Sequence, residues 1–466
     1  MSISRINNSN RKINKLHNTT MFNKKFFYII LLMLFGGALS AQAQLELSLD
    51  ECIRIALNEN PTIKVQEMEI TRVDYSHKEA LGQLLPTINL AGQYQRNLSL
   101  QTMYMDTEAG TMAIKMGSDN THAAGFQAQI PLIVPQLWKS IKLSENQILQ
   151  NVEKARANKL SLVNQVEKAY YALLLAMDSK RVIEENHATA KLNADIFQKK
   201  YELGAASEYD VLRANVAVTN LEPAIMEAEN SITALLFQLK VLMGMDVRTE
   251  IAPSQQLNDF RGEMYARALN NTLGADTTLA NNTSLKALDL QTDYLKKALD
   301  VQKMAWYPTL TGSASVMWHS MNNGSPFTGL RWSRASNVGL AIAFPIFQGG
   351  QRYYKQKQAE IAVEEMKWQR ENLERSLHMQ VATQNDVIVK NLKQIESNEA
   401  GVTMAQKAND IMQKSFKIGA ASFIQLRDTE DALMAARLAY YQAIYNYLVA
   451  ESDLEFVLGN THYVRN

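Results

Sequence analysis

The chain has 466 residues, of which 46% are apolar and 20% are charged, so its composition is that of a folded protein and not of a disordered one. Its 48 Lys and Arg residues nearly balance 47 Asp and Glu residues, which argues against nucleic acid as a partner. The single cysteine, Cys52, excludes an intramolecular disulfide and a cysteine-rich zinc site, and it reads as a small buried residue of a short helix.

The N-terminus has the layout of a secretory signal. Two lysines precede an apolar run over residues 26–39, and small residues follow at Ala41 and Ala43. We expect residues 1–43 to be an N-terminal extension and cleaved signal peptide, with Met1 and Met21 both open as the start. The apolar run of 14 residues is short for a membrane-spanning helix, which needs roughly 20, although an uncleaved anchor stays an alternative.

The first half of the mature chain predicts a helix over 62–81, followed by two strands over about 87–95 and 124–131. In these strands apolar residues alternate with small or polar, uncharged ones. Pro86 and Pro131 stand at the start and end of the pair. The segment 97–122 joins the two strands, and we expect it to be a loop in which Asn120 is exposed.

A very long helix follows. From Pro135 to Gly204 there are 68 residues without Gly or Pro, and apolar residues recur at threes and fours in them. At 1.5 Å per residue such a helix reaches about 100 Å. A turn, Gly204-Ala205-Ala206-Ser207, leads into a returning helix that ends near Met243 and is broken by Pro223.

The second half repeats this plan. The turn reappears as Gly419-Ala420-Ala421-Ser422, a helix over 283–305 precedes strands over about 309–318 and 335–344, and a second run of 68 residues is interrupted only by Gly401. Pro308 and Pro345 take the places of the first pair of prolines. We therefore divide the mature chain into a first structural repeat (44–244), a connecting equatorial segment (245–281) and a second structural repeat (282–466). The segment 320–333, which includes Asn323, is the second predicted loop.

Four strands with one polar and one apolar face fit a membrane barrel, with lipid outside and water inside. A soluble four-stranded sheet covered by helices is the alternative. In a bilayer a sheet must close, and single-chain barrels begin at about eight strands, so several copies must contribute to one barrel. Two copies would give a plugged barrel, and a water-filled bore needs three or more.

The duplicated helix-strand-strand-helix plan resembles the TolC-type outer-membrane efflux channel family. The stretch Phe344-Pro345-Ile346-Phe347-Gln348-Gly349-Gly350 before a long helix and the Gly-x-x-Ser turns carry this resemblance over about residues 47–460. It implies an α+β membrane protein: a homotrimer with a β-barrel of four strands per chain in outer-membrane lipid, and a long α-helical coiled-coil barrel extending through the periplasm. It also implies a periplasmic adaptor (membrane fusion) protein and an inner-membrane pump as partners, in tripartite efflux or type I secretion.

In the family, the two glycine turns form the periplasmic entrance, here Gly204 to Ser207 and Gly419 to Ser422. Acidic residues six and nine positions after the second glycine narrow that entrance. The corresponding residues are Gln425 and Asp428, so one acidic ring is replaced by an amide. Three copies of Asp428 around one axis would favour cations. A solvated aspartate at the start of a helix is the alternative reading, and Phe423 is then a candidate for an apolar ring.

The closed-state contacts of the family are not preserved. Asp210 matches an acidic residue whose partner in the family is a tyrosine, and Phe416 stands at the tyrosine position. A family arginine is replaced by Ala421, so the way in which a closed tip would be held stays open.

The sequence contains no Gly-rich phosphate loop, paired metal-ligand motif or nucleophile elbow, so we expect neither an enzyme nor a cofactor. The second function considered is a periplasmic helical-hairpin structural or adaptor protein without a pore. The four membrane-length alternating strands argue against it, because an adaptor does not need them. Neither the transported substrate nor the class of pump follows from the sequence.

Overall fold

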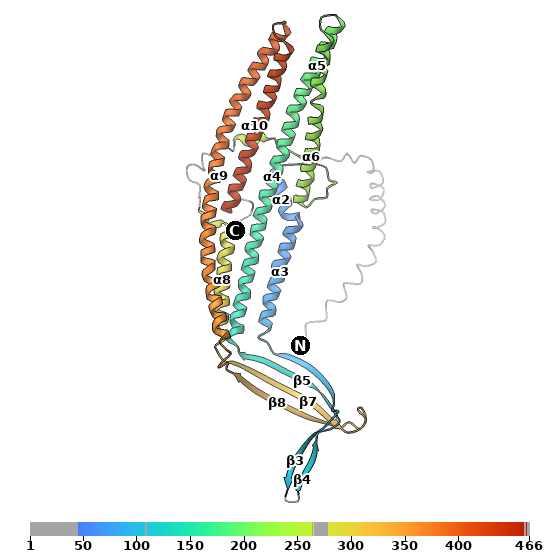
Figure 1. Ribbon diagram of the computed structural model, residues 1–466, viewed down its shortest axis with the longest axis vertical. Coiled ribbons are helices and arrows are strands. Elements are labelled where there is room, and N and C mark those ends of the chain that lie inside the picture. Colours follow the sequence, from blue (N-terminus) through green and yellow to red (C-terminus); the bar gives the residue numbers. More distant parts are fainter. Residues whose placement is uncertain (1–44, 108–109, 263, 265–277, 461–462, 464–466) are drawn as a thin grey trace, which may run out of the picture.

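The computed structural model describes residues 45–107, 110–262, 264, 278–460 and 463. The predicted signal peptide (1–43) lies outside the described residues, as does part of the predicted connecting segment 245–281. The described chain is an elongated helical bundle with a four-stranded sheet at one end (Figure 1).

Two helices run almost the whole length of the bundle, α4 (Pro135–Glu202) and α9 (Gln351–Lys417). They contain 68 and 67 residues, so each is about 100 Å long, as the scarcity of helix breakers predicts. Shorter helices pack along them: α3 (Pro61–Gly82), α5 (Glu208–Thr219) and α6 (Glu222–Met243) along α4, and α8 (Thr283–Met304) and α10 (Phe423–Leu458) along α9. In the described part of the chain no helix is both long and apolar enough to cross a membrane.

The shorter helices meet end to end at two equivalent joints. Asn60 caps α3 by accepting from the Thr62 backbone N–H (2.8 Å), and its Nδ2 donates to the Leu242 carbonyl at the end of α6 (2.8 Å). In the second half Asn282 caps α8 in the same way and donates to the Val457 carbonyl of α10 (2.6 Å). At each joint, a single asparagine side chain therefore forms hydrogen bonds with a backbone N–H at the start of one helix and with a backbone carbonyl at the end of another, two groups that have no partner within their own helix.

The main hydrophobic core lies at the middle of the bundle. There α2 (Leu49–Glu59) packs against α4 and α6, and the short parallel pair β1 (Leu45–Leu47) and β6 (Ile251–Pro253) adds residues to the same core. Tyr170 and Tyr447 are fully buried, and the Tyr170 hydroxyl donates to the Leu47 carbonyl (3.0 Å). Cys52 is fully buried on α2, as predicted, and burial raises its pKa to about 12, so the thiol is unreactive at neutral pH. Two short 3₁₀ helices, η1 (Leu257–Phe260) and η2 (Leu279–Asn281), complete this region.

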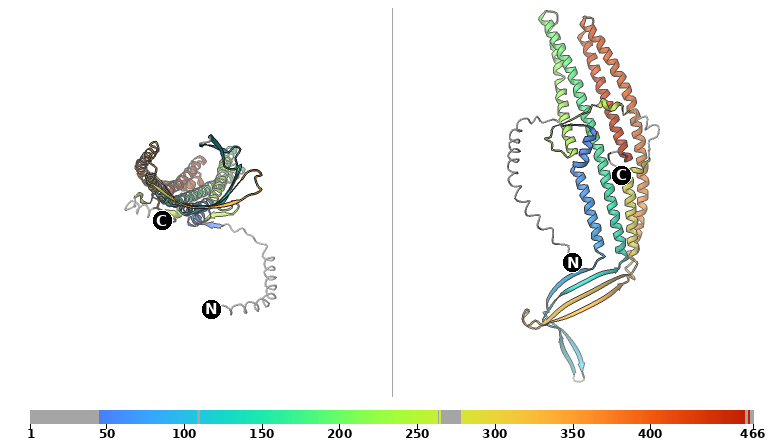
Figure 2. Two further views of the ribbon diagram at one scale, coloured as in Figure 1. Left: turned by 90° about the horizontal axis from the view of Figure 1, so that it is seen from below. Right: turned by 180° about the vertical axis from the view of Figure 1, so that it is seen from behind.

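The four-stranded sheet is antiparallel throughout, in the order β2-β5-β7-β8. Its strands are β2 (Thr87–Arg96), β5 (Asn120–Ile133), β7 (Thr309–Asn322) and β8 (Trp332–Ala343). All four overlap the segments that the alternation predicts. β5, β7 and β8 are longer than expected, and the inner strands β5 and β7 are extended the most. Seen from the end, the sheet and the helices curve into one open arc (Figure 2).

The expectation of a plain loop over 97–122 is wrong. This segment forms the hairpin β3 (Gln101–Thr107) and β4 (Gly110–Met116), and then the first residues of β5. Asn120 is fully buried, not exposed: its Oδ1 accepts from the Tyr94 hydroxyl (2.9 Å), and its Nδ2 donates to the Gly324 carbonyl (3.1 Å). The polar character of Asn120 thus reflects hydrogen bonding at a strand end and not solvent exposure.

Of the four prolines, Pro86 and Pro308 directly precede β2 and β7, and Pro345 follows β8. Pro131 lies inside β5, which continues to Ile133, so it does not end the strand as expected. The register with β7 shifts between Pro131 and Ile133. Proline has no N–H to donate to a ladder, and a bulge is a position at which a strand tolerates it.

Candidate functional site: the open-edged sheet and the hairpin tips

The sheet has one apolar and one polar face, and its register shows this row by row. One row across the four strands is Ile88, Ala128, Ala314 and Val338, and the next row, on the other face, is Asn89, Gln127, Ser315 and Asn337. The polar row is uncharged and is linked by a hydrogen bond between Ser315 Oγ and Asn337 Oδ1 (2.6 Å). This is the alternation of a barrel wall with lipid on one side and water on the other.

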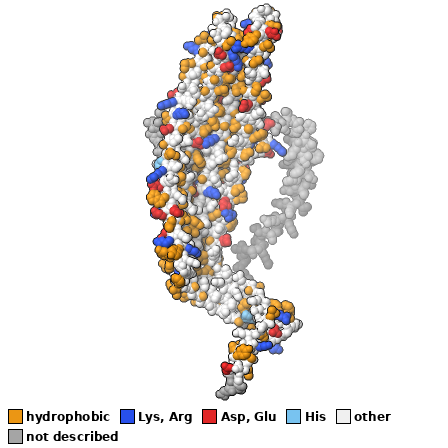
Figure 3. All heavy atoms as spheres, viewed as in Figure 1, with side chains coloured by type: hydrophobic (Ala, Val, Ile, Leu, Met, Phe, Trp, Pro, Cys, Tyr) orange, Lys and Arg blue, Asp and Glu red, His pale blue; other side chains and the backbone are white. Residues whose placement is uncertain are grey.

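The apolar face is open in the single chain. Leu90 is 71% exposed on β2, and Val338 is 87% exposed on β8. Charged side chains are scattered along the visible face of the helices, whereas the visible part of the sheet is mostly uncharged (Figure 3). The end strands β2 and β8 each have only one neighbour among the described strands. Both edges therefore carry backbone groups that need partners from outside the chain.

At the opposite end of the molecule, both long helices stop at a left-handed glycine. Gly204 has φ +71° and Gly419 has φ +78°. The residue after each glycine donates its N–H back to the last turn, Ala205 to the Lys200 carbonyl (2.7 Å) and Ala420 to the Ser415 carbonyl (2.8 Å). Only glycine adopts this conformation without strain, which explains why both turns contain it.

The returning helices both begin with a capping box. Ser207 Oγ accepts from the Asp210 N–H (3.2 Å), and the Asp210 carboxylate accepts from the Ser207 N–H (3.2 Å). Ser422 and Gln425 repeat this arrangement at the start of α10. The hydrogen bonds from the Ser207 side chain and backbone lower the pKa of Asp210. Gln425 and Asp210 thus have a structural role that the Ser-x-x-Asp and Ser-x-x-Gln spacing could have revealed.

Each glycine turn joins two antiparallel helices, α4 and α5 in one helical hairpin and α9 and α10 in the other. Three phenylalanines join these two helical hairpins near the turns. Phe197 of α4 lies 4.7 Å from Phe423 of α10 and 5.9 Å from Phe416 of α9, measured between ring centroids. Lys200 Nζ lies 5.2 Å from the centroid of the Phe416 ring. Phe416, which lacks the hydroxyl expected from the resemblance, therefore contributes an apolar contact between the hairpins instead of a hydrogen bond to Asp210.

Asp428 lies one turn beyond the capping box and is exposed. Its neighbour Arg427 is paired with Asp431 (3.0 Å) on the same helix. Ser422, at the tip, is also exposed. Asp428 is therefore available to solvent or to a neighbouring copy, and no basic side chain within the described ranges forms an ion pair with it.

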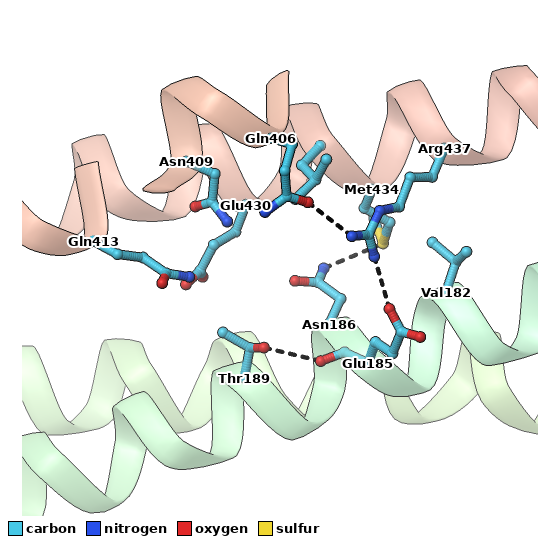
Figure 4. Close-up of a pocket in the computed structure, with 11 residues that line it drawn as sticks. Val182, Glu185, Asn186, Thr189, Gln406, Asn409, Gln413, Glu430, Met434 and Arg437 are labelled. Carbon is cyan, nitrogen blue, oxygen red and sulfur yellow. Dashed lines mark hydrogen bonds and ion pairs between the residues drawn. The ribbon is translucent and has the colours of Figure 1, made fainter. Parts of the chain in front are cut away.

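Further from the tip, the contact between α4 and the α9/α10 pair is polar. A cavity of about 210 Å³ there is lined by Glu185, Asn186, Thr189, Gln406, Asn409, Gln413, Glu430 and Arg437 together with three apolar side chains (Figure 4). Arg437 crosses the contact: it binds Glu185 of α4 (2.7 Å) and Gln406 of α9 (2.8 Å).

Glu430 is the buried acid of this cavity, with 4% of its surface exposed. Its Oε1 accepts from Asn193 Nδ2 of α4 (3.1 Å), and its Oε2 has no hydrogen-bond partner among the described residues. Burial raises the pKa of Glu430, and the Asn193 hydrogen bond and the Arg427 charge oppose this only in part. The contact between α4 and the α9/α10 pair, called the seam below, thus contains a buried carboxyl group of which only one oxygen has a hydrogen-bond partner among the described residues. Sequence patterns do not reveal this group.

Comparison with known proteins decides the family. The model of the outer membrane efflux protein family matches residues 52–245 and 275–460. The chain belongs to the outer membrane efflux protein family. This family provides channel components and not enzymes, and its members lie in the outer membrane with a long periplasmic helical extension.

Relatives of known name cover most of the chain at low identity. The alkaline protease secretion protein AprF of Pseudomonas aeruginosa is 24% identical over 407 residues, 87% of this chain and 83% of that protein. The outer membrane protein TolC of Vibrio cholerae is 22% identical, over 81% of this chain and 82% of that protein. Among solved structures, CusC superposes with a TM-score of 0.71 at 16% identity, over 90% of this chain and 93% of that one, which shows a shared fold.

Proposed function

We propose that this chain forms the outer-membrane channel of a tripartite efflux or type I secretion system. In this proposal three copies build one twelve-stranded barrel, and their helices continue it as a tunnel through the periplasm. A periplasmic adaptor and an inner-membrane pump deliver substrate to the helical end, and the barrel releases it outside.

The observation that carries this proposal is the combination of an open-edged sheet with an apolar outer face and two helices of about 100 Å in the same chain. The edges of β2 and β8 must be paired in a bilayer, and the four strands of one chain are too few to close. Three copies would supply twelve strands, which is enough for a water-filled bore.

The domain division supports the same arrangement. We assign the repeats 44–244 and 282–466 to equivalent positions in the tunnel wall, and the described parts of the connecting segment, 245–262 and 278–281, to the middle of that wall. The two joints at Asn60 and Asn282 support this assignment, because they repeat the same capping contact in both halves.

For the entrance, we place Asp428 at the constriction. It is exposed near the Gly419 turn, and threefold symmetry would put three carboxylates around one axis. In this arrangement Gln425, Asp210, Ser207 and Ser422 build the capping boxes. Phe416 and Phe423 hold the two helical hairpins of one chain together by packing against Phe197 of α4.

Channel recordings test the proposal. Purified protein reconstituted in planar bilayers should give discrete conductance steps, with a preference for cations that falls on neutralisation of Asp428. Insertion into the bilayer without any conductance, under a voltage ramp and after removal of divalent cations, would contradict a channel.

A further inference from the structure

The hairpin formed by β3 and β4 extends beyond the sheet, at the end away from the helices (Figure 1). It connects β2 with β5, and its strands pair with each other and not with the four-stranded sheet. In the orientation of the family it projects outside the cell. Neither the barrel nor the tunnel requires it.

One face of this hairpin carries four methionines. The register places Met105 opposite Met112, Met103 opposite Ile114, and Gln101 opposite Met116. Residues opposite each other in an antiparallel pair point to the same face, and so do residues two apart on one strand. Four of the 21 methionines of the chain therefore share this face.

The methionines are not covered by the rest of the chain. Met103 is 44% exposed, Met105 48%, Met112 57% and Met116 52%. The other face of the hairpin is mixed: Tyr104 and Ala113 lie between polar pairs, and Asp106 accepts a hydrogen bond from Thr111 (2.7 Å). Burial in a core thus does not explain the choice of methionine, which is neither β-branched nor aromatic and so is not a preferred strand residue.

Thioether sulfur has a specific chemistry. It is a neutral, soft donor, which suits monovalent copper and similar ions, whereas carboxylates and carbonyls suit hard cations. Directly opposite residues have Cβ atoms about 5 Å apart, and diagonal neighbours about 7–8 Å, so long flexible side chains can bring their sulfurs together. Met103 is a diagonal neighbour of both Met112 and Met116. Three sulfurs, those of Met103, Met105 and Met112, can therefore converge on one ion.

We propose that this methionine face is a binding site for a soft monovalent metal ion, Cu⁺ or Ag⁺, with Met103, Met105 and Met112 as ligands and Met116 as a fourth. The register puts no carboxylate, histidine or cysteine on this face. A site made only of thioethers needs no deprotonation, so its affinity stays constant between about pH 5 and 8, unlike that of a cysteine or histidine site.

Silver is the probe of choice because Ag⁺ needs no reductant. The full-length mature protein in detergent is titrated with Ag⁺ by equilibrium dialysis and metal analysis. The test variant is M103L/M105L/M112L, which keeps the apolar area and removes three sulfurs. The matched control is M68L/M226L/M379L, which removes three methionines that are 63%, 57% and 64% exposed on separate helices.

We expect one tight Ag⁺ per chain in the native protein and in the control, at least tenfold weaker binding in the hairpin variant, and no displacement by a tenfold excess of Zn²⁺. Equal binding by the native protein and the hairpin variant overturns the proposal, as does an equal loss in the control. Unchanged Ag⁺ binding together with an altered oligomeric state on Met→Gln substitution also overturns it, because the face is then a contact between copies.

Discussion

The two left-handed glycines that follow α9 and α10 differ in the space around them, and this makes the end-to-end joints testable. Gly459 and Gly419 have φ values of +69° and +78°, so an alanine at either position adopts the left-handed conformation at a cost of about 1 kcal/mol. A Cβ at Gly459 would lie 2.7 Å from the carbonyl carbon of Asn281, whereas nothing lies within 4 Å of a Cβ at Gly419.

The backbone of Asn281, which lies opposite Gly459, cannot move away by itself, because the adjacent Asn282 side chain donates a hydrogen bond to the Val457 carbonyl of α10. The joint must open, which removes that hydrogen bond, about 1 kcal/mol, and disturbs the packing around it. We therefore expect Gly419→Ala to lower the free energy of unfolding by about 1 kcal/mol per chain, and Gly459→Ala by about 3 kcal/mol.

Unfolding of both variants in one detergent, followed by far-UV circular dichroism against guanidinium concentration, compares their midpoints. The first half repeats the experiment, because a Cβ at Gly244 would lie 2.7 Å from the Glu59 carbonyl oxygen and one at Gly204 meets nothing within 4 Å. Equal midpoints for Gly419→Ala and Gly459→Ala, or for Gly204→Ala and Gly244→Ala, would refute the joints as described.

Three further predictions follow from the tip, the seam and the loops. Asp428→Asn should lower cation selectivity and weaken block by multivalent cations in planar bilayers. The control Glu365→Gln, which changes an exposed acid near the sheet end of α9, should do neither. Equal effects of the two substitutions contradict a constriction at Asp428. Because the pKa of Glu430 is raised in the folded protein, its contribution to stability is complete below about pH 4 and is lost as the pH rises through that pKa. Glu430→Gln should therefore raise the unfolding midpoint at pH 8 and not at pH 4. An unchanged midpoint at pH 8 contradicts the burial of a charged Glu430 between the helical hairpins. A cysteine at Ser325, which is exposed between β7 and β8, should react with an impermeant reagent on intact cells, and one at Ser207 should not; the reverse result inverts the orientation.

Much of the fold could be predicted from the sequence, because the patterns that specify its helices and strands extend over many residues and lie within single elements. Runs of 68 residues with almost no breaker fix α4 and α9, and the alternation of small polar and apolar residues fixes β2, β5, β7 and β8. The break before α6 follows from Pro223, which cannot continue a helix begun before it.

Other features were readable but missed. The Ser-x-x-Asp and Ser-x-x-Gln spacings at Ser207 and Ser422 indicate capping boxes, which give Asp210 and Gln425 a structural role. Apolar residues at alternate positions, Met103 and Met105 and then Met112, Ile114 and Met116, indicate a hairpin within the segment that was expected to be a loop.

The seam and the joints could not be predicted, because they depend on which helix faces meet. Glu430 is one of many acids on helical runs, and only the packing of α10 on α4 buries it against Asn193. Asn60 and Asn282 each cap a helix in a local way, yet their second contact is with a residue more than 170 positions away in the sequence.

The mass of the purified mature protein in detergent, measured by native mass spectrometry or by light scattering with the detergent contribution subtracted, tests the central claim most directly. The open edges of β2 and β8 and the exposed apolar face of the sheet predict a single species with three times the mass of one mature chain. A monodisperse, folded monomer would contradict both the shared barrel and the tunnel.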